Sequence, residues 1–133
     1  MKCKKGTLVI NPRSGKNIAQ LPDVLTVLAA AGWKTELALK EYGGQTIELA
    51  TTAAEDGSDL VIAYGGDGTL NQVVNGVMRA QGQRSIVGVI PGGTANQWAA
   101  EIDVPLEPVK AALMLVDSDA CKVDIGIMAF SYI

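Results

Sequence analysis

The chain has 133 residues, 48% of them hydrophobic, and a formal net charge of −3. This size and composition predict one domain with its own apolar core. The acidic total argues against general nucleic-acid binding, because such binding depends on neutralising many phosphates. The chain has no histidine, so any catalysis must use carboxylates, hydroxyls and backbone amides.

The sequence shows no sign of a membrane span or a leader. No apolar run approaches the ~20 residues that a spanning helix needs, and residues 1–6 lack the apolar stretch of a signal peptide. We therefore expect a cytoplasmic protein. Cys3 and Cys121 are far apart and lack metal-site spacing, so reduced thiols are expected. Residues 1–40 hold seven Lys/Arg against two Asp/Glu, which predicts contact with phosphate or an anionic membrane, or else a plain solvated surface.

Strand and helix patterns alternate along the chain. In chain order they predict strand 7–10, helix 18–28, strand 33–39, helix 45–55, strand 60–64, helix 70–78, strand 86–90, helix 105–116 and strand 122–127. Three of these strands (7–10, 60–64 and 86–90) are apolar at nearly every position, which is typical of parallel strands covered on both faces. The expected fold is a three-layer α/β sandwich with a mainly parallel sheet and right-handed crossovers.

The ligand site of an open parallel sheet forms beyond the carboxyl ends of its strands. Three unusual loops follow predicted strands there, namely residues 11–16 (NPRSGK), 65–69 (GGDGT) and 91–96 (PGGTAN). No GxGxxG follows the first strand and no GxxxxGK[ST] is present, so neither a Rossmann dinucleotide site nor a P-loop is supported. A structural turn explains the first or third loop taken singly, but three such loops at one edge favour phosphate binding.

The second loop has the clearest physical interpretation. Its three glycines predict a tight turn that approaches an anion closely, and Gly68 or Thr69 is expected to start a helix whose apolar pattern begins at Leu70. Asp67 repels phosphate unless a divalent cation lies between them, which suggests magnesium. The alternative is that Asp67 and Thr69 only cap the helix.

The loop motifs together resemble those of a known family. NPRSGK, GGDGTLNQVVNG at 65–76 and IPGGTANQWA at 90–99 resemble the catalytic domain of diacylglycerol, sphingosine and related lipid kinases. GGDGT alone is shared with NAD kinases, whereas the other two motifs favour the lipid kinases. The resemblance covers residues 7–126 and implies a phosphofructokinase/NAD kinase-like fold.

The resemblance implies that ATP and Mg²⁺ are bound at these loops. The implied nucleotide-binding residues are Asn11, Pro12, Arg13, Ser14, Gly15, Gly65, Gly66, Asp67, Gly68, Thr69, Leu70, Asn71 and Thr94. Asp67 and Asp124 are the implied metal-side residues, acting through water, although Asp124 at a strand end is also explained as a simple cap.

Two positions depart from the family pattern. Gln97 stands where the family usually has aspartate, which removes one charge from the acidic network. Lys40 stands where many members have a nucleotide-contacting threonine, and its ammonium group meets either a phosphate or solvent.

Family members continue into a β-rich domain that supplies a catalytic carboxylate and much of the lipid pocket. We therefore expect residues 1–126 to form the nucleotide-binding domain and 127–133 to start the next domain, with a C-terminal strand edge as the alternative. No residue of this chain is assigned as the general base, and the chain alone is expected to be inactive.

The implied function is transfer of the γ-phosphate of ATP to a hydroxyl of a diacylglycerol-like lipid at a membrane surface. Peripheral membrane association and a possible homodimer belong to this expectation. The alternatives are an NAD kinase-like enzyme with a soluble acceptor, and a nucleotide-sensing module without catalysis, which Gln97 favours.

Overall fold

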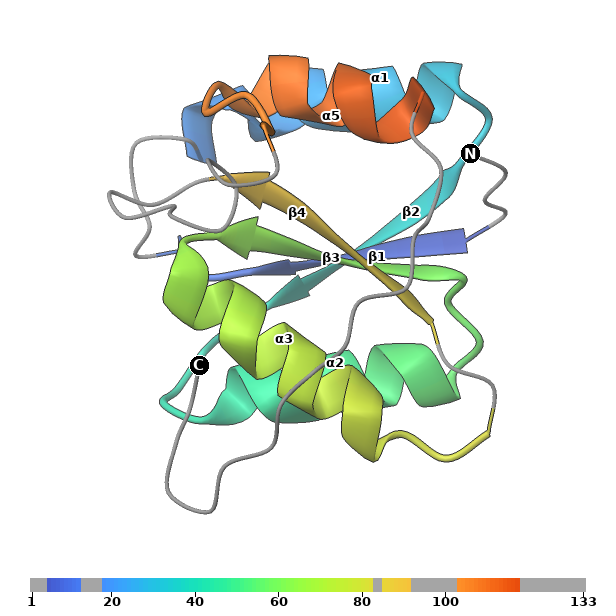
Figure 1. Cartoon of the computed structure of the whole chain (residues 1–133), viewed down its shortest axis with the longest axis vertical. Coiled ribbons are helices and arrows are strands. Elements are labelled where there is room, and N and C mark those ends of the chain that lie inside the picture. Colours follow the sequence, from blue (N-terminus) through green and yellow to red (C-terminus); the bar gives the residue numbers. More distant parts are fainter. Residues whose placement is uncertain (1–4, 13–17, 83–84, 92–102, 118–133) are drawn as a thin grey trace.

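The computed structural model describes residues 5–12, 18–82, 85–91 and 103–117. These residues form a sheet with helices on both faces (Figure 1). The predicted strand 122–127 and the tail 127–133 lie outside the described residues. Among the described residues, no helix is both long and apolar enough to cross a bilayer.

Within the described residues, the sheet has four parallel strands. They are β1 (Lys5–Ile10), β2 (Lys34–Leu39), β3 (Leu60–Gly65) and β4 (Ile86–Pro91), in the spatial order β2-β1-β3-β4. In the register of the central pair, Leu8 lies opposite Ile62 and Ile10 opposite Tyr64. The predicted parallel sheet is therefore confirmed, with strand limits within about two residues of those expected from the sequence.

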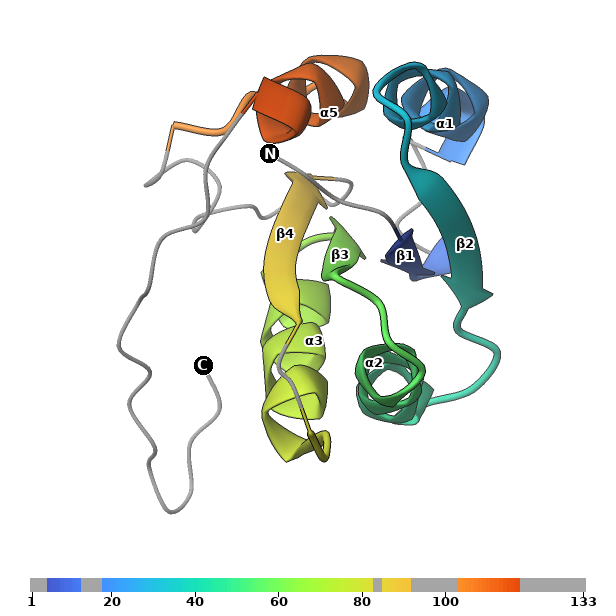
Figure 2. The same ribbon diagram turned by 90° about the vertical axis from the view of Figure 1, so that its right-hand side faces the viewer.

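Helices cover both faces of the sheet, as Figure 2 shows in end view. The helices α1 (Leu21–Ala30) and α5 (Pro108–Asp117) pack on one face, and α2 (Gln45–Glu55) and α3 (Asp67–Arg79) pack on the other. This arrangement confirms the three-layer α/β sandwich. The core has two parts to match, one on each side of the sheet.

The side chains of the central strands alternate between the two parts of the core. Leu8, Ile62 and Tyr64 face α1 and α5, whereas Val9 and Val61 face α2 and α3. All five are at most 1% exposed, so β1 and β3 are covered on both faces as predicted. Burial raises the pKa of the Tyr64 phenol to about 12, which keeps this side chain neutral in the core.

The sequence interpretation was wrong for β4 in one respect. Only the last part of this strand is covered on both faces, and Ile86 at its start is 38% exposed. The reason is that β4 is an edge strand of the four-stranded sheet, so its outer side has no described neighbour.

Three predicted helices begin at different residues in the structure. Residues 18–20 form a 3₁₀ turn before α1, which places Pro22 in the first turn of the helix, where its missing N–H costs no hydrogen bond. The helix expected from 105 begins at Pro108, and the helix expected to begin near Leu70 begins at Asp67. The apolar period identifies the buried face, but it does not locate the polar first turn.

Gly76 allows the two helices on the lower face in Figure 1 to pack closely. A Cβ atom at this position would collide with the Ile47 carbonyl oxygen and with the Ala50 methyl group. The Thr51 hydroxyl, which lies 2.7 Å from the Gly76 carbonyl oxygen, links α2 to α3 at the same point. This contact fixes α3, and therefore the loop before it, relative to the sheet.

Candidate functional site

The predicted loops leave the sheet from neighbouring strands at one edge. Ile10 lies opposite Tyr64, and Gly65 lies opposite Pro91. The loops that follow β1, β3 and β4 therefore start side by side at the carboxyl edge, where α3 also begins (Figure 1). This edge is where ligands bind in open parallel sheets.

The structure describes only part of the predicted site. Asn11 and Pro12 after β1 are described, as is the whole segment from Gly65 to Asn71. The other predicted residues lie outside the described part of the chain, namely Arg13, Ser14, Gly15, Thr94, Gln97 and Asp124.

The first turn of α3 directs backbone amides toward the carboxyl edge. The N-cap is Gly66, in an extended conformation, and the first bond of the helix runs from the Leu70 N–H to the Gly66 carbonyl oxygen at 3.1 Å. Gly68 and Thr69 precede this bond in the first turn, so their N–H groups have no partner in the helical ladder. Such a turn favours a bound anion.

Asp67 occupies the first helical position instead of capping the helix. The N-cap position belongs to Gly66, which has no side chain to form a capping hydrogen bond. The predicted start at Gly68 or Thr69 was therefore wrong, and so was the alternative that Asp67 serves as the cap. The Asp67 carboxylate lies within the first turn, where the helix dipole stabilises negative charge.

The glycines of the loop make the short turn from β3 to α3 without a left-handed backbone. Among the described glycines, those with positive φ are Gly32, Gly44, Gly57 and Gly82. Gly65 is required for a different reason, because a Cβ atom there would lie 2.6 Å from Oγ1 of the buried Thr69. A Cβ atom at Gly68 would meet no atom within 4 Å, which leaves open space beside the first turn.

Asn71 is held by a residue that sequence analysis did not identify. Asn75 Nδ2 lies 2.9 Å from the Asn71 carbonyl oxygen and 3.2 Å from Asn71 Oδ1. Asp67, Asn71 and Asn75 are each four residues apart, so they share one face of α3. The polar i, i+4 spacing was visible in the sequence, but only the apolar spacing was used to interpret this helix.

The loop after β2 joins the same edge. The Lys40 N–H donates to the Ile10 carbonyl oxygen at 2.9 Å, which places the Lys40 backbone beside the start of the loop that follows β1. Further along, the Tyr42 hydroxyl donates to Glu48 Oε2 at 3.0 Å, and this contact raises the pKa of Tyr42. Lys40 is thus near the predicted site, and its half-buried side chain is compatible with a role there.

Asp67 is suited to bind a metal ion that is also coordinated by a bound ligand. Among the described residues, no three His, Cys, Asp or Glu side chains are grouped closely enough to hold a metal by themselves. One carboxylate with phosphate oxygens and water is nevertheless a donor set that magnesium prefers. Asp67 fits such a shared site.

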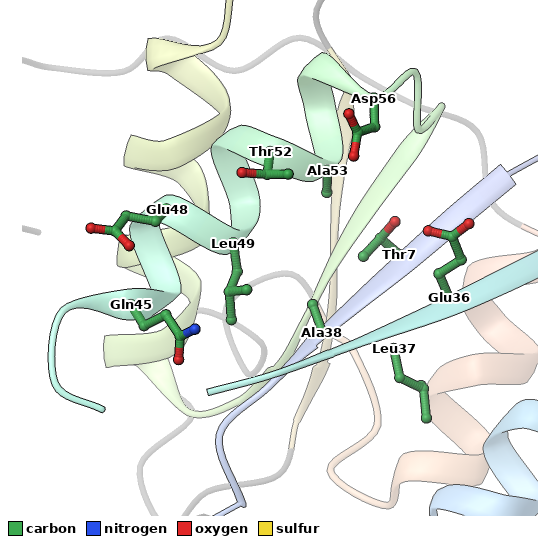
Figure 3. Close-up of a pocket in the computed structure, with 10 residues that line it drawn as sticks. All are labelled: Thr7, Glu36, Leu37, Ala38, Gln45, Glu48, Leu49, Thr52, Ala53 and Asp56. Carbon is green, nitrogen blue, oxygen red and sulfur yellow. The ribbon is translucent and has the colours of Figure 1, made fainter. Parts of the chain in front are cut away.

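A groove elsewhere on the surface contains none of the predicted site residues. It has a volume of about 310 Å³ and runs between α2 and β2, where Leu49 and Ala53 face the sheet (Figure 3). Three carboxylates also line it, those of Glu36, Glu48 and Asp56. Because these charges repel phosphate, the groove is a poor nucleotide site, and the carboxyl edge is the better candidate.

The fold and this edge define an α/β domain with a candidate anion site at the start of α3. Residues 5–128 match the family model described as the diacylglycerol kinase catalytic domain. The chain belongs to this family, which confirms the resemblance inferred from the motifs.

Individual relatives agree with this assignment. The chain is 42% identical over 131 residues to a diacylglycerol kinase of Staphylococcus epidermidis, with 97% of this chain and 41% of that protein covered. It is 39% identical to a diacylglycerol kinase of Staphylococcus haemolyticus, with 98% and 39% covered. The crystal structure of a diacylglycerol kinase from Bacillus anthracis superposes with a TM-score of 0.78 at 28% identity, covering 88% of this chain and 44% of that one. The chain thus spans about two fifths of the length of these proteins.

Proposed function

We propose that this chain is the ATP-binding domain of a lipid kinase, which transfers the γ-phosphate of ATP to a hydroxyl of a diacylglycerol-like lipid. The observation that supports it best is the meeting of the β1 and β3 loops with the amide-rich start of α3 at one edge. Family membership supplies the reaction class.

In this proposal, the nucleotide phosphates lie against the first turn of α3. The N–H groups of Gly68 and Thr69 donate to phosphate oxygens, and the open space beside Gly68 lets the ligand approach the backbone. Asn11 and Pro12 approach from the neighbouring strand. Arg13, Ser14, Gly15 and Thr94, at the predicted positions of their loops, complete the phosphate contacts.

We assign the binding of Mg²⁺ to Asp67 and Asp124, which would hold the ion through water. When bound, Mg²⁺ neutralises the charge of the transferring phosphate. The Asp67 carboxylate would otherwise repel the phosphates that the same turn attracts.

The acceptor side of the reaction belongs outside this chain in our proposal. Residues 1–126 bind the nucleotide, 127–133 begin a β-rich domain, and that domain provides the general base and the lipid pocket. The supporting observation is that the chain spans about two fifths of its relatives. The whole protein would act as a cytoplasmic enzyme at the membrane surface, where its acceptor is found.

An acceptor assay tests this proposal. The whole protein is incubated with labelled ATP, Mg²⁺ and diacylglycerol in mixed micelles, and residues 1–133 alone serve as the comparison. We expect labelled phosphatidic acid from the whole protein only. Phosphorylation of NAD or a sugar phosphate without lipid would support the soluble-acceptor alternative, and ATP binding without transfer to any acceptor would support the nucleotide sensor.

A further inference from the structure

The carboxamides of Asn71 and Asn75 have only one consistent orientation. The backbone carbonyl oxygen of Asn71 can only accept, so the Asn75 atom 2.9 Å from it must be the NH₂ nitrogen. The same nitrogen lies 3.2 Å from the Asn71 side chain. The Asn71 atom at that point must therefore be its oxygen, because two NH₂ groups cannot bond to each other.

This orientation decides what Asn71 presents to a ligand. Its oxygen is occupied by Asn75, so its own NH₂ group lies on the side away from Asn75. Side chains on a helix lean toward its N-terminus, and Asp67 lies one turn earlier on the same face. An Asn71 NH₂ group that follows this lean would lie near the first turn of α3 and could donate to a ligand there.

We propose that Asn75 is a positioning residue for the nucleotide site, which holds the Asn71 carboxamide with its NH₂ group toward the phosphates. Asn75 is exposed, eight residues beyond Asp67, and it acts only through Asn71. This proposal rests on the proposed function, because it needs a phosphate ligand at the start of α3.

Two substitutions separate this role from a structural one. Asn75→Ala removes the hold on Asn71 while favouring the helix, because alanine is the better helix former. Asn75→Asp does more, because a carboxylate can only accept and would draw the Asn71 NH₂ group toward itself. The Asn71 oxygen would then face the phosphates and repel them.

The test measures the affinity of the whole protein for ATP with Mg²⁺, together with its melting temperature. We expect Asn75→Ala to weaken binding about three- to tenfold, the range of one modest hydrogen bond, without lowering the melting temperature. Asn75→Asp should weaken binding further. In steady-state assays the KM for ATP should rise more than kcat falls.

A double-mutant series provides the control. In an Asn71→Ala background, both Asn75 substitutions should leave affinity unchanged, because the residue through which Asn75 acts is absent. If Asn75→Asp weakens binding equally in that background, the cause is charge repulsion and the positioning role is wrong. Normal affinity in both single variants would also overturn it. Failure of the wild-type protein to bind ATP would overturn the proposed function itself, and the positioning role with it.

Discussion

At the residue scale, the glycines of GGDGT have separate physical roles. Gly65 is required by its contact with Thr69, whereas Gly68 has open space where a side chain would stand. The sequence singled out these glycines, but it could not distinguish their roles, because both depend on atoms brought close by the fold.

The open space at Gly68 makes a sharp test of the phosphate site. Gly68→Ala should raise the free energy of unfolding by up to about 1 kcal/mol, because glycine is unfavourable in a helix. It should nevertheless weaken ATP binding, and Gly68→Val should weaken it more. Titration with ATP and urea unfolding measure the two effects. Undiminished ATP affinity in both variants would remove Gly68 from the site.

The matched control for this test is Gly65→Ala. This substitution drives a methyl group into the Thr69 hydroxyl, so it should lower stability as well as affinity. The contrast between the two glycines separates loss of the ligand contact from damage to the loop.

Asp67→Asn tests the metal assignment. With Mg²⁺ present, we expect ATP affinity to fall about tenfold, because the charge that the cation offsets is gone. With the metal chelated, affinity should stay the same or rise, because a repulsive charge has been removed. Equal losses in the two conditions would point to a purely structural role at the start of α3.

At the element scale, helix limits were the least predictable feature. Helix 45–55 was predicted with the limits that the structure shows, because its polar N-terminal flank and its apolar positions agree. The start of α3 was missed because Asp67 and Gly68 are poor formers of helix interiors, although the first turn tolerates them. Apolar spacing alone also did not identify Asn75, whose contacts in the structure are with the polar residue Asn71.

The packing of α2 on α3 gives a prediction for Gly76. Gly76→Ala should lower the free energy of unfolding by about 1–3 kcal/mol, because the added methyl group forces the two helices apart. Gly68→Ala, in the same helix, is the control for helix propensity. Denaturant unfolding of both variants checks this, and equal stability in the two would mean that α2 and α3 separate without cost.

At the scale of the whole molecule, the sequence predicted the layers and the parallel sheet. It did not predict which strands lie next to each other in the sheet. Lys40 meets Ile10 because β2 lies beside β1, and strand order cannot be derived from apolar runs. The groove between α2 and β2 also depends on that order. The loops after β1 and β3 were correctly predicted to meet at one edge, because parallel strands end on the same side.

The most direct test of the nucleotide site is hydrogen exchange of the whole protein with and without ATP and Mg²⁺. Binding at the carboxyl edge should slow exchange at the amide of Asn11 and at residues 65–71, where amides and ligand would meet. Amides along the groove, in residues 36–38 and 45–56, should change little. Protection of the groove with no change at 65–71 would contradict our account, because it would place the nucleotide between α2 and β2.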